Sequence, residues 1–287
     1  MRLPTPLLHR RSNSSKGDFG HIFILAGSAR FSGAAVLSSW AAMRSGCGLV
    51  TLGIPRGLNN AIIKIKPLEV MTLPLPETRK GSLSLGAYKK IKDFLKNIDV
   101  LLVGPGLSTD KSTQALIRRV IGSFDKSLVI DADGLNALAG HPRKLKLAAK
   151  KAKNLVITPH PGEMSRLLGV SVKTVQAKRK EIAKRFARDN GVTLVLKGFR
   201  TVVVDPKGNL YINRTGNPGM GTAGSGDVLS GMVASFLGQG LDGFSAAKYA
   251  VYLHGLAGDL AEKEKTQLGM IASDIIEKIP EAIKKSN

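Results

Sequence analysis

Apolar residues along the chain occur mainly in short continuous runs, and most runs are followed by a segment with apolar residues at helical spacing. Short apolar runs rich in β-branched residues predict strands that are buried on both faces. The predicted strands are 21–26, 49–54, 99–103, 128–131, 155–158 and 193–197. The predicted helices are 33–44, 89–96, 111–120, 162–168 and 172–189. This alternation predicts an α/β fold with a mostly parallel sheet covered by helices on both faces.

The second half of the chain departs from this alternation. Two β-branched runs, 201–204 and 210–213, flank the turn-forming sequence DPKGN and predict an antiparallel hairpin at the edge of the sheet. Everything beyond Gly226 is predicted to be helical, beginning with a helix over 228–237. Because no repeat, linker or low-complexity segment is found, we expect one domain spanning 1–287.

The composition is that of a globular protein, with 43% hydrophobic and 22% charged residues. No apolar run reaches the length of a membrane span, and the first residues lack the apolar core of a signal peptide. The single cysteine, Cys47, lies in an apolar run and is predicted to be a core residue. We therefore expect a cytoplasmic protein in a reducing compartment, without a membrane partner.

The formal net charge of +22 favours anionic partners such as nucleic acids, anionic membrane surfaces or phosphorylated small molecules. The lysines and arginines of 144–153 and 173–188, however, alternate with apolar residues in a pattern typical of solvated helix faces. Aromatic residues make up only 5%, which leaves few side chains for stacking bases and disfavours a nucleic-acid partner. The purpose of the excess charge stays open.

Glycines and polar residues gather where the predicted parallel strands end, which is where ligands bind in such sheets. Asp131, Asp133 and Asn136 could hold magnesium through water or orient a substrate hydroxyl, although Asp133 could also be a turn former. His160 is either a structural turn residue or a ligand contact, and Glu163 is either a helix cap or a polar site residue. Lys197 ends its strand at this edge and is a candidate for a nucleotide-phosphate contact.

The densest glycine cluster, GNPGMGTAGSGDVLSG over 216–231, runs directly into a predicted helix. A glycine loop at the start of a helix presents unpaired amides at the positive end of the helix dipole and is suited to binding phosphate. Beside such amides, Asp227 could accept a proton from an attacking hydroxyl; the alternative is that Asp227 only caps the helix. The chain contains no P-loop, no complete dinucleotide fingerprint and no zinc-type cysteine and histidine spacing.

Several motifs in order make the chain resemble the ADP/ATP-dependent NAD(P)H-hydrate dehydratase family of the ribokinase-like superfamily. Besides the glycine cluster, they are SSKGDFGH, GSARFSGAA, VGPGL, DADGLNAL, TPHPGEMSRLLG and LKGFRT. The resemblance extends from about Arg10 to the last helix. It implies a ribokinase-like three-layer sandwich and the repair of (6S)-hydrated NADH or NADPH, with ADP or ATP as phosphate donor, Mg²⁺ as cofactor, and AMP (from ADP) and phosphate as products.

The resemblance also implies roles for individual residues. Asp227 would be the base on the substrate hydroxyl. The anion hole would be formed by Gly224, Ser225 and Gly226. The nucleotide would contact Gly226 and the segment Lys197, Gly198, Phe199, Arg200 and Thr201. The hydrated dinucleotide would contact Ala35, Gly106, His160 and Asp227, with Asn136 and Glu163 nearby. None of these residues is implied as a permanent metal ligand.

The chain departs from the family pattern at Phe31, where tyrosine is common, and at Phe199, where a small residue is usual. The upstream epimerase domain of many members is absent from this sequence, so we expect action on one epimer unless a separate epimerase supplies the other. The resemblance further implies a homo-oligomer, a tetramer or larger, and favours ADP over ATP. Two alternatives remain: a ribokinase-like kinase of a vitamin precursor, and a basic nucleic-acid-binding protein.

Overall fold

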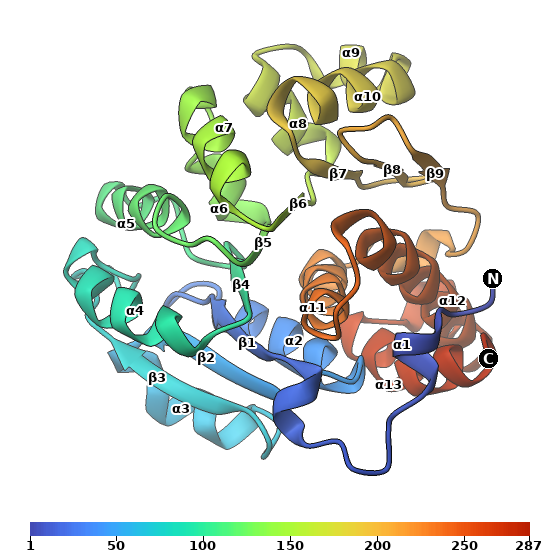
Figure 1. The fold of residues 1–287 in the computed structure, drawn as a ribbon, viewed down its shortest axis with the longest axis horizontal. Helices are drawn as coiled ribbons and strands as arrows, with labels where there is room; N and C mark the ends of the chain where they lie inside the picture. Colours follow the sequence, from blue (N-terminus) through green and yellow to red (C-terminus); the bar gives the residue numbers. More distant parts are fainter.

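A nine-stranded sheet forms the centre of the protein in a computed structural model that describes residues 1–287 (Figure 1). The strands are β1 (His21–Leu25), β2 (Leu49–Pro55), β3 (Met71–Leu75), β4 (Val100–Val103), β5 (Ser127–Ile130), β6 (Asn154–Ile157), β7 (Thr193–Leu196), β8 (Val202–Val204) and β9 (Leu210–Ile212). Their order is β3-β2-β1-β4-β5-β6-β7-β8-β9, with all pairs parallel up to β7 and antiparallel from β7 to β9. The predicted strands and the edge hairpin are therefore confirmed.

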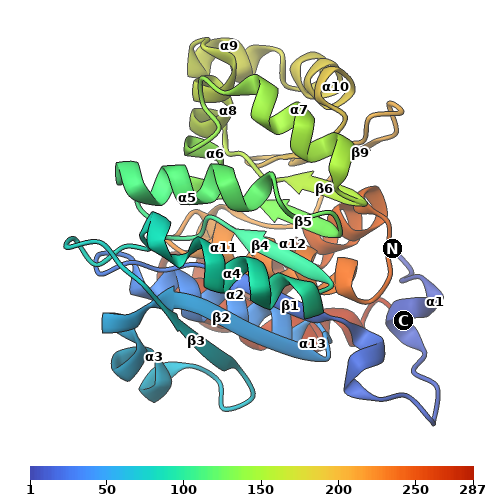
Figure 2. The same cartoon turned by 60° about the vertical axis from the view of Figure 1, so that its left-hand side comes forward.

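Helices cover both faces of this sheet, as Figures 1 and 2 show. One face carries α2 (Ser32–Arg44), α3 (Asn59–Ile65), α11 (Ser225–Gly238), α12 (Gly243–Gly269) and α13 (Ala272–Lys284), together with the short α1 (Thr5–Leu8). The other face carries α4 (Tyr88–Phe94), α5 (Lys111–Ile121), α6 (Ala132–Asn136), α7 (Pro142–Lys151), α8 (Pro161–Leu168), α9 (Val172–Ala177) and α10 (Arg179–Asn190). No helix combines the length and the apolar character needed to cross a bilayer.

The strands are apolar throughout because each face of the sheet has its own core. In β1, Ile22 and Ile24 join the core beneath α2 and α11, whereas Phe23 and Leu25 join the core on the opposite face. The two cores contain 42 and 36 buried residues, so neither face of the sheet is left to solvent. Cys47 is buried in the first core as predicted, and this burial raises the pKa of its thiol to about 12.

The predicted helix over 172–189 is wrong in one respect, because the chain forms two helices there. α9 ends at Ala177 and α10 begins at Arg179, with Lys178 between them at φ −125° and ψ 35°. The guanidinium of Arg179 donates hydrogen bonds to Leu196 O at 2.8 Å and to Lys197 O at 3.2 Å. This tertiary contact fixes the start of α10 against the end of β7, and no glycine or proline marks the break in the sequence.

Strand β3 was not predicted, because its sequence MTLPL includes Pro74 and lies outside the recognised runs. Proline is tolerated on an edge strand, and β3 is the edge of this sheet next to β2. From β3 the chain crosses back to pair β4 with β1. The connections after β1 and β4 therefore leave from neighbouring strand ends on opposite sides of the sheet, which is the usual position of a ligand site.

Candidate active site

The glycine cluster forms a fixed loop that leads into α11. Its start is held by Asp259 of α12, whose carboxylate accepts hydrogen bonds from Gly216 N at 3.0 Å and Asn217 Nδ2 at 3.3 Å. At its end, Gly224 adopts φ 89° and ψ −16°, and a Cβ at this position would lie 2.3 Å from Leu37 Cδ1. A side chain there would be strained and crowded, so the turn into the helix requires glycine.

The first amides of α11 are available to a ligand. No side chain caps the helix, and the amides of Gly226 and Asp227 have no acceptor within the chain. The amide of Ser225 makes only a long contact of 3.4 Å with Thr222 O. Free amides at a helix N-terminus favour an anion. Interpreting Asp227 as only a cap is wrong, because Gly224 occupies the cap position and the Asp227 carboxylate bonds to no amide of the helix.

The environment of Asp227 suits a general base at neutral pH. Burial first, and the nearby carboxylate of Asp131 second, raise the pKa of its carboxyl group to about 7 against the opposing effect of Lys197. An isolated aspartate has a pKa near 3.8. A base whose pKa lies near the working pH is still ionised in part and accepts a proton more readily.

A buried ion-pair cluster lies beside the start of α11. Lys197 Nζ is 2.8 Å from Asp131 Oδ1 and 3.8 Å from Glu163 Oε2, and the two carboxylate side chains are 1% and 6% exposed. Burial alone would lower the pKa of Lys197, but Asp131 and Glu163 outweigh it and raise this pKa. A Cβ on Gly226 would lie 3.2 Å from Lys197 Nζ, so the ammonium group also lies next to the glycine loop.

His160 and Glu163 form a reciprocal cap on α8. His160 Nδ1 accepts from the amides of Gly162 and Glu163 at 3.0 and 3.3 Å, and Glu163 Oε2 accepts from His160 N at 2.8 Å. The structural interpretations of both residues are therefore confirmed. The His160 side chain nevertheless remains 49% exposed, so it can also contact a ligand.

Asp131 and Asp133 do not share one site. Asp131 pairs with Lys197, whereas Asp133 accepts from Ser108 N at 2.8 Å and from Asn136 Nδ2 at 2.9 Å. No group of three or more His, Cys, Asp or Glu side chains is arranged to hold a metal ion. The hydroxyl of Thr158, which directly follows β6, is buried without a hydrogen-bond partner.

A cavity of about 530 Å³ lies where the connections after β1 and β4 leave the sheet. It is lined by Asp227, by Gly106 and Asp133 from the neighbouring strand ends, and by the exposed cations Arg30 and Lys80. Two hydrogen bonds join the strand ends, from Gly27 N to Pro105 O and from Ser28 Oγ to Gly106 O, each 2.8 Å long. Gly106 and Asp227, predicted from distant motifs, thus line the same cavity.

The remaining predicted residues lie outside the lining of this cavity. The Ala35 side chain is fully buried, and its neighbour Ala34 lines the cavity instead. Gly198, Phe199 and Arg200 are exposed after β7, with Phe199 88% exposed. Thr201 Oγ1 donates to Gly198 O at 2.9 Å and closes this turn.

Sequence reasoning missed three residues at the site. Arg30 lies within GSARFSGAA, one of the motifs that carry the family resemblance, but Lys80 lies in a turn with no recognisable signal. His254 of α12 is buried with its Nε2 3.4 Å from Ser225 Oγ, and burial lowers its pKa to about 4. A neutral histidine of α12 therefore contacts Ser225 at the start of α11.

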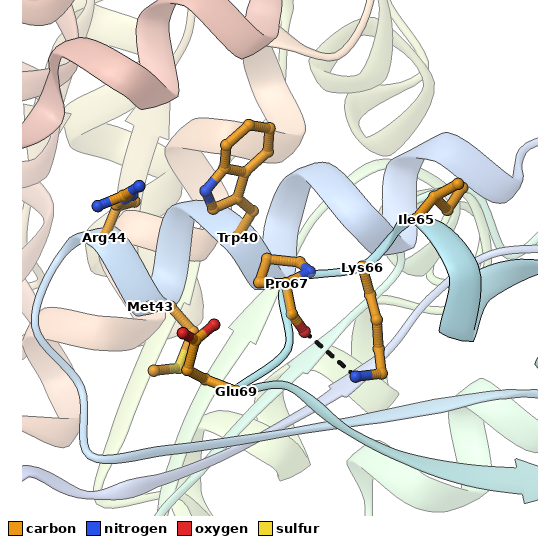
Figure 3. A pocket seen from close by; sticks show the side chains of 7 residues that line it. All are labelled: Trp40, Met43, Arg44, Ile65, Lys66, Pro67 and Glu69. Atoms are coloured by element: carbon orange, nitrogen blue, oxygen red, sulfur yellow. Dashed lines mark hydrogen bonds between the residues drawn. The ribbon is translucent and has the colours of Figure 1, made fainter.

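A second cavity, of about 490 Å³, lies at the C-terminal end of α2 (Figure 3). Trp40 and Arg44 of α2 line it on one side, and Ile65, Lys66 and Glu69 line it on the other. Lys66 Nζ donates to Pro67 O at 3.2 Å within its wall. It shares no residue with the cavity of Asp227 and includes neither a strand end of the glycine-rich edge nor the α11 amides.

Comparison with known proteins agrees with this geometry. The family described as NAD(P)H-hydrate dehydratase matches residues 22–281. The bifunctional NAD(P)H-hydrate repair enzyme of Moorella thermoacetica is 45% identical over 274 residues, which are 96% of this chain but 51% of that protein. The ADP-dependent (S)-NAD(P)H-hydrate dehydratase of Neisseria meningitidis is 37% identical over 96% of this chain and 88% of its own length. The chain thus spans about half the length of its bifunctional relatives.

Comparison with a solved structure supports the same family. The ADP/ATP-dependent NAD(P)H-hydrate dehydratase of Bacillus subtilis, co-crystallised with ATP and Mg²⁺, superposes with a TM-score of 0.83 at 31% identity. The match covers 97% of this chain and 94% of that one, which confirms the predicted ribokinase-like three-layer fold. Since the family match and the structural match both extend over nearly the whole chain, this protein belongs to the NAD(P)H-hydrate dehydratase family.

Proposed function

We propose that this chain is a carbon–oxygen lyase that dehydrates (6S)-hydrated NADH or NADPH at the expense of ADP, or less readily ATP. The observation that carries the proposal is the position of Asp227, in the first turn of α11 beside free amides and inside a cavity. The names of the Neisseria and Bacillus relatives support the substrate and the nucleotide.

The residues support a two-stage reaction. Asp227 accepts the proton of the substrate hydroxyl. The hydroxyl oxygen attacks the terminal phosphorus of ADP, and AMP leaves. The amides of Gly226 and Asp227 stabilise the charge on the phosphoryl group in transit. The carbon–oxygen bond of the phosphorylated hydrate then breaks, inorganic phosphate leaves, and the adjacent ring carbon loses a proton to restore the double bond.

Magnesium fits this site as an ion carried by the nucleotide. Mg²⁺ usually retains several waters and binds through one or two carboxylates together with substrate phosphates. Asp131, which follows β5, would contribute the carboxylate oxygen that Lys197 does not bind, and Thr158, which follows the adjacent β6, has an unpartnered hydroxyl. When bound, the ion would neutralise phosphate charge. The segment from Lys197 to Thr201 would contact the nucleotide.

The test is the recovery of the near-ultraviolet absorbance of reduced nicotinamide from hydrated NADH in the presence of Mg²⁺. We expect recovery with ADP, slower recovery with ATP and none without nucleotide. A protein that binds nucleotide but restores no absorbance with either donor would contradict the dehydratase and favour the small-molecule kinase. Binding of RNA or DNA that is insensitive to Asp227→Asn, without turnover, would favour the nucleic-acid alternative.

The pH dependence of turnover should follow Asp227. Because a base must be ionised and the pKa of Asp227 is raised to about 7, kcat/KM is expected to increase with pH and level off above about pH 7. Below that value it should fall about tenfold per pH unit. Initial rates between pH 5 and 9 at low substrate concentration measure this profile. A flat profile across pH 5 to 8 would exclude Asp227 as the base.

Two partner assignments complete the proposal. A separate epimerase would convert the other epimer of the hydrate, in line with the second activity of the bifunctional relatives. Self-association, with a tetramer as the expected state, would use the edge of the sheet at β3. Exposed apolar residues gather there: Ile63 and Ile65 of α3, Met71 of β3, and Leu68 between them, which is 92% exposed. Exposed apolar side chains gathered beside an edge strand favour association.

Self-association can be tested by charge insertion at this edge. Leu68→Glu is expected to lower the molar mass measured by light scattering, because a carboxylate would be buried without a partner at the interface. Leu268→Glu is a matched control, since Leu268 is 98% exposed at the end of α12. Equal masses for the wild type and both variants would place the interface elsewhere.

A further inference from the structure

Two segments that are distant in sequence meet at the cavity of Asp227. The connection after β1 and the hairpin after β3 are joined by a hydrogen bond from Ala29 N to Gly81 O at 2.8 Å. Gly81 has φ 70°, and a Cβ there would lie 2.7 Å from Ala29 Cβ. The approach therefore requires glycine, and it brings Arg30 and Lys80, the neighbours of these two residues, into the lining of one cavity.

The hairpin that carries Lys80 is rigidly built. Thr78 N donates to Ser82 O at 2.7 Å, and the hydroxyls of Thr78 and Ser82 are 3.0 Å apart. Thr113 of α5, which is fully buried, donates to Ser82 Oγ at 2.9 Å and to Leu83 O at 2.7 Å. The hairpin, which follows β3 in Figure 2, is thus anchored in the core, and the backbone of Lys80 is held at the cavity.

The two cations of the cavity have no acidic partner. Arg30 and Lys80 form no ion pair, and the guanidinium of Arg30 lies 5.5 Å from the centroid of the Phe31 ring. The Asp133 carboxylate is already occupied by Ser108 N and Asn136 Nδ2. The lining of the cavity therefore includes two cations without ion pairs, together with the carboxylate of Asp227.

We propose that Arg30 and Lys80 bind the diphosphate of the hydrated dinucleotide while its ring lies toward Asp227. The proposal rests on the proposed function and adds how that site holds the rest of the substrate. A diphosphate is also present in ADP, but the residues assigned to ADP, Gly226 and the segment after β7, lie elsewhere: Lys197 to Thr201 contribute nothing to this cavity. Free guanidinium and ammonium groups are well matched to phosphate oxygens.

The test compares Arg30→Gln, Lys80→Gln and the double variant with Arg79→Gln. Arg79 is the exposed neighbour of Lys80 that does not line the cavity, so its variant controls for the loss of one positive charge. We expect each single change to raise the KM for hydrated NADH about tenfold, with kcat and the KM for ADP unchanged within about twofold. Arg79→Gln should behave as the wild type.

Equilibrium binding of NADH, followed by its fluorescence, provides a readout that needs no turnover. The dissociation constant should rise in parallel with KM in the Arg30 and Lys80 variants. Gly81→Ala, which displaces the hairpin, should have the same effect as Lys80→Gln. Gly86→Ala should not, because a Cβ at Gly86 would approach only Ser84 Oγ, at 3.5 Å.

The outcomes separate this proposal from the proposed function. Unchanged NADH binding in the double variant, an equal effect of Arg79→Gln, or a rise in the KM for ADP instead would each overturn the diphosphate site. If the Arg30 and Lys80 variants bind NADH more weakly than the wild type, but the wild type does not convert hydrated NADH to NADH, the diphosphate site is supported and the dehydratase activity is refuted.

Discussion

Asp227→Asn is expected to abolish dehydration of hydrated NADH while leaving nucleotide binding intact. Asparagine keeps the size of the side chain and the fold of α11 but cannot accept a proton. General-base groups contribute roughly 10²- to 10⁴-fold to rate, so turnover should fall by about that factor. Steady-state rates and ADP binding by calorimetry measure the two properties separately. Retained turnover would refute the assignment of Asp227 as the base.

The same substitution should stabilise the protein at alkaline pH. The pKa of Asp227 is about 7 in the folded protein and near 3.8 without burial, so the folded state binds its proton more tightly than the unfolded chain. The ionised carboxylate therefore lowers stability progressively as pH rises from about 4 to 7, and its full cost is present above pH 7. The difference in pKa corresponds to at most about 4 kcal/mol.

Urea unfolding at two pH values tests this effect. At pH 8 Asp227→Asn should be more stable than the wild type, and at pH 5, between the two pKa values, the difference should be less than half as large. A gain of the same size at both pH values would show that the asparagine acts through packing and that the carboxylate carries no burial cost.

Lys197→Met is expected to be the most destabilising single change at the site. It leaves Asp131 and Glu163 buried without their cation, and removing one partner of a buried pair costs roughly 3–5 kcal/mol. It also removes the positive charge that lowers the pKa of Asp227, so any remaining activity should require higher pH. Urea unfolding and a pH–rate profile measure these two effects.

Two controls sharpen the experiment. Lys96→Met removes a lysine whose ion pair with Asp93 is solvent-exposed, and exposed pairs contribute little. Adding Asp131→Asn to Lys197→Met should recover part of the lost stability, because one uncompensated carboxylate is neutralised. If the loss of unfolding free energy in the double variant equals the sum of the losses in the two single variants, the residues do not act as a pair.

Much of the fold could be predicted from local patterns. Continuous β-branched runs predict strands buried on both faces, and this is how Ile22 and Phe23 come to face two different cores. The hairpin of β8 and β9 followed from its turn residues, and the α11 loop followed from its glycines. Local signals failed where a distant contact intervened: Arg179 bonds to the end of β7 and separates α9 from α10.

The sequence by itself determined the chemical groups of the site, because glycine loops, strand ends and a carboxylate before a helix are local features of the chain. Only the tertiary structure decided their partners. Lys197 reaches Asp131 across 66 residues, and Lys80 joins Arg30 because Gly81 permits contact with Ala29. Burial and the nearby Asp131 carboxylate, which raise the pKa of Asp227, depend on distances in space. Such distances arise only when the parallel strands bring their carboxyl ends to one edge of the sheet.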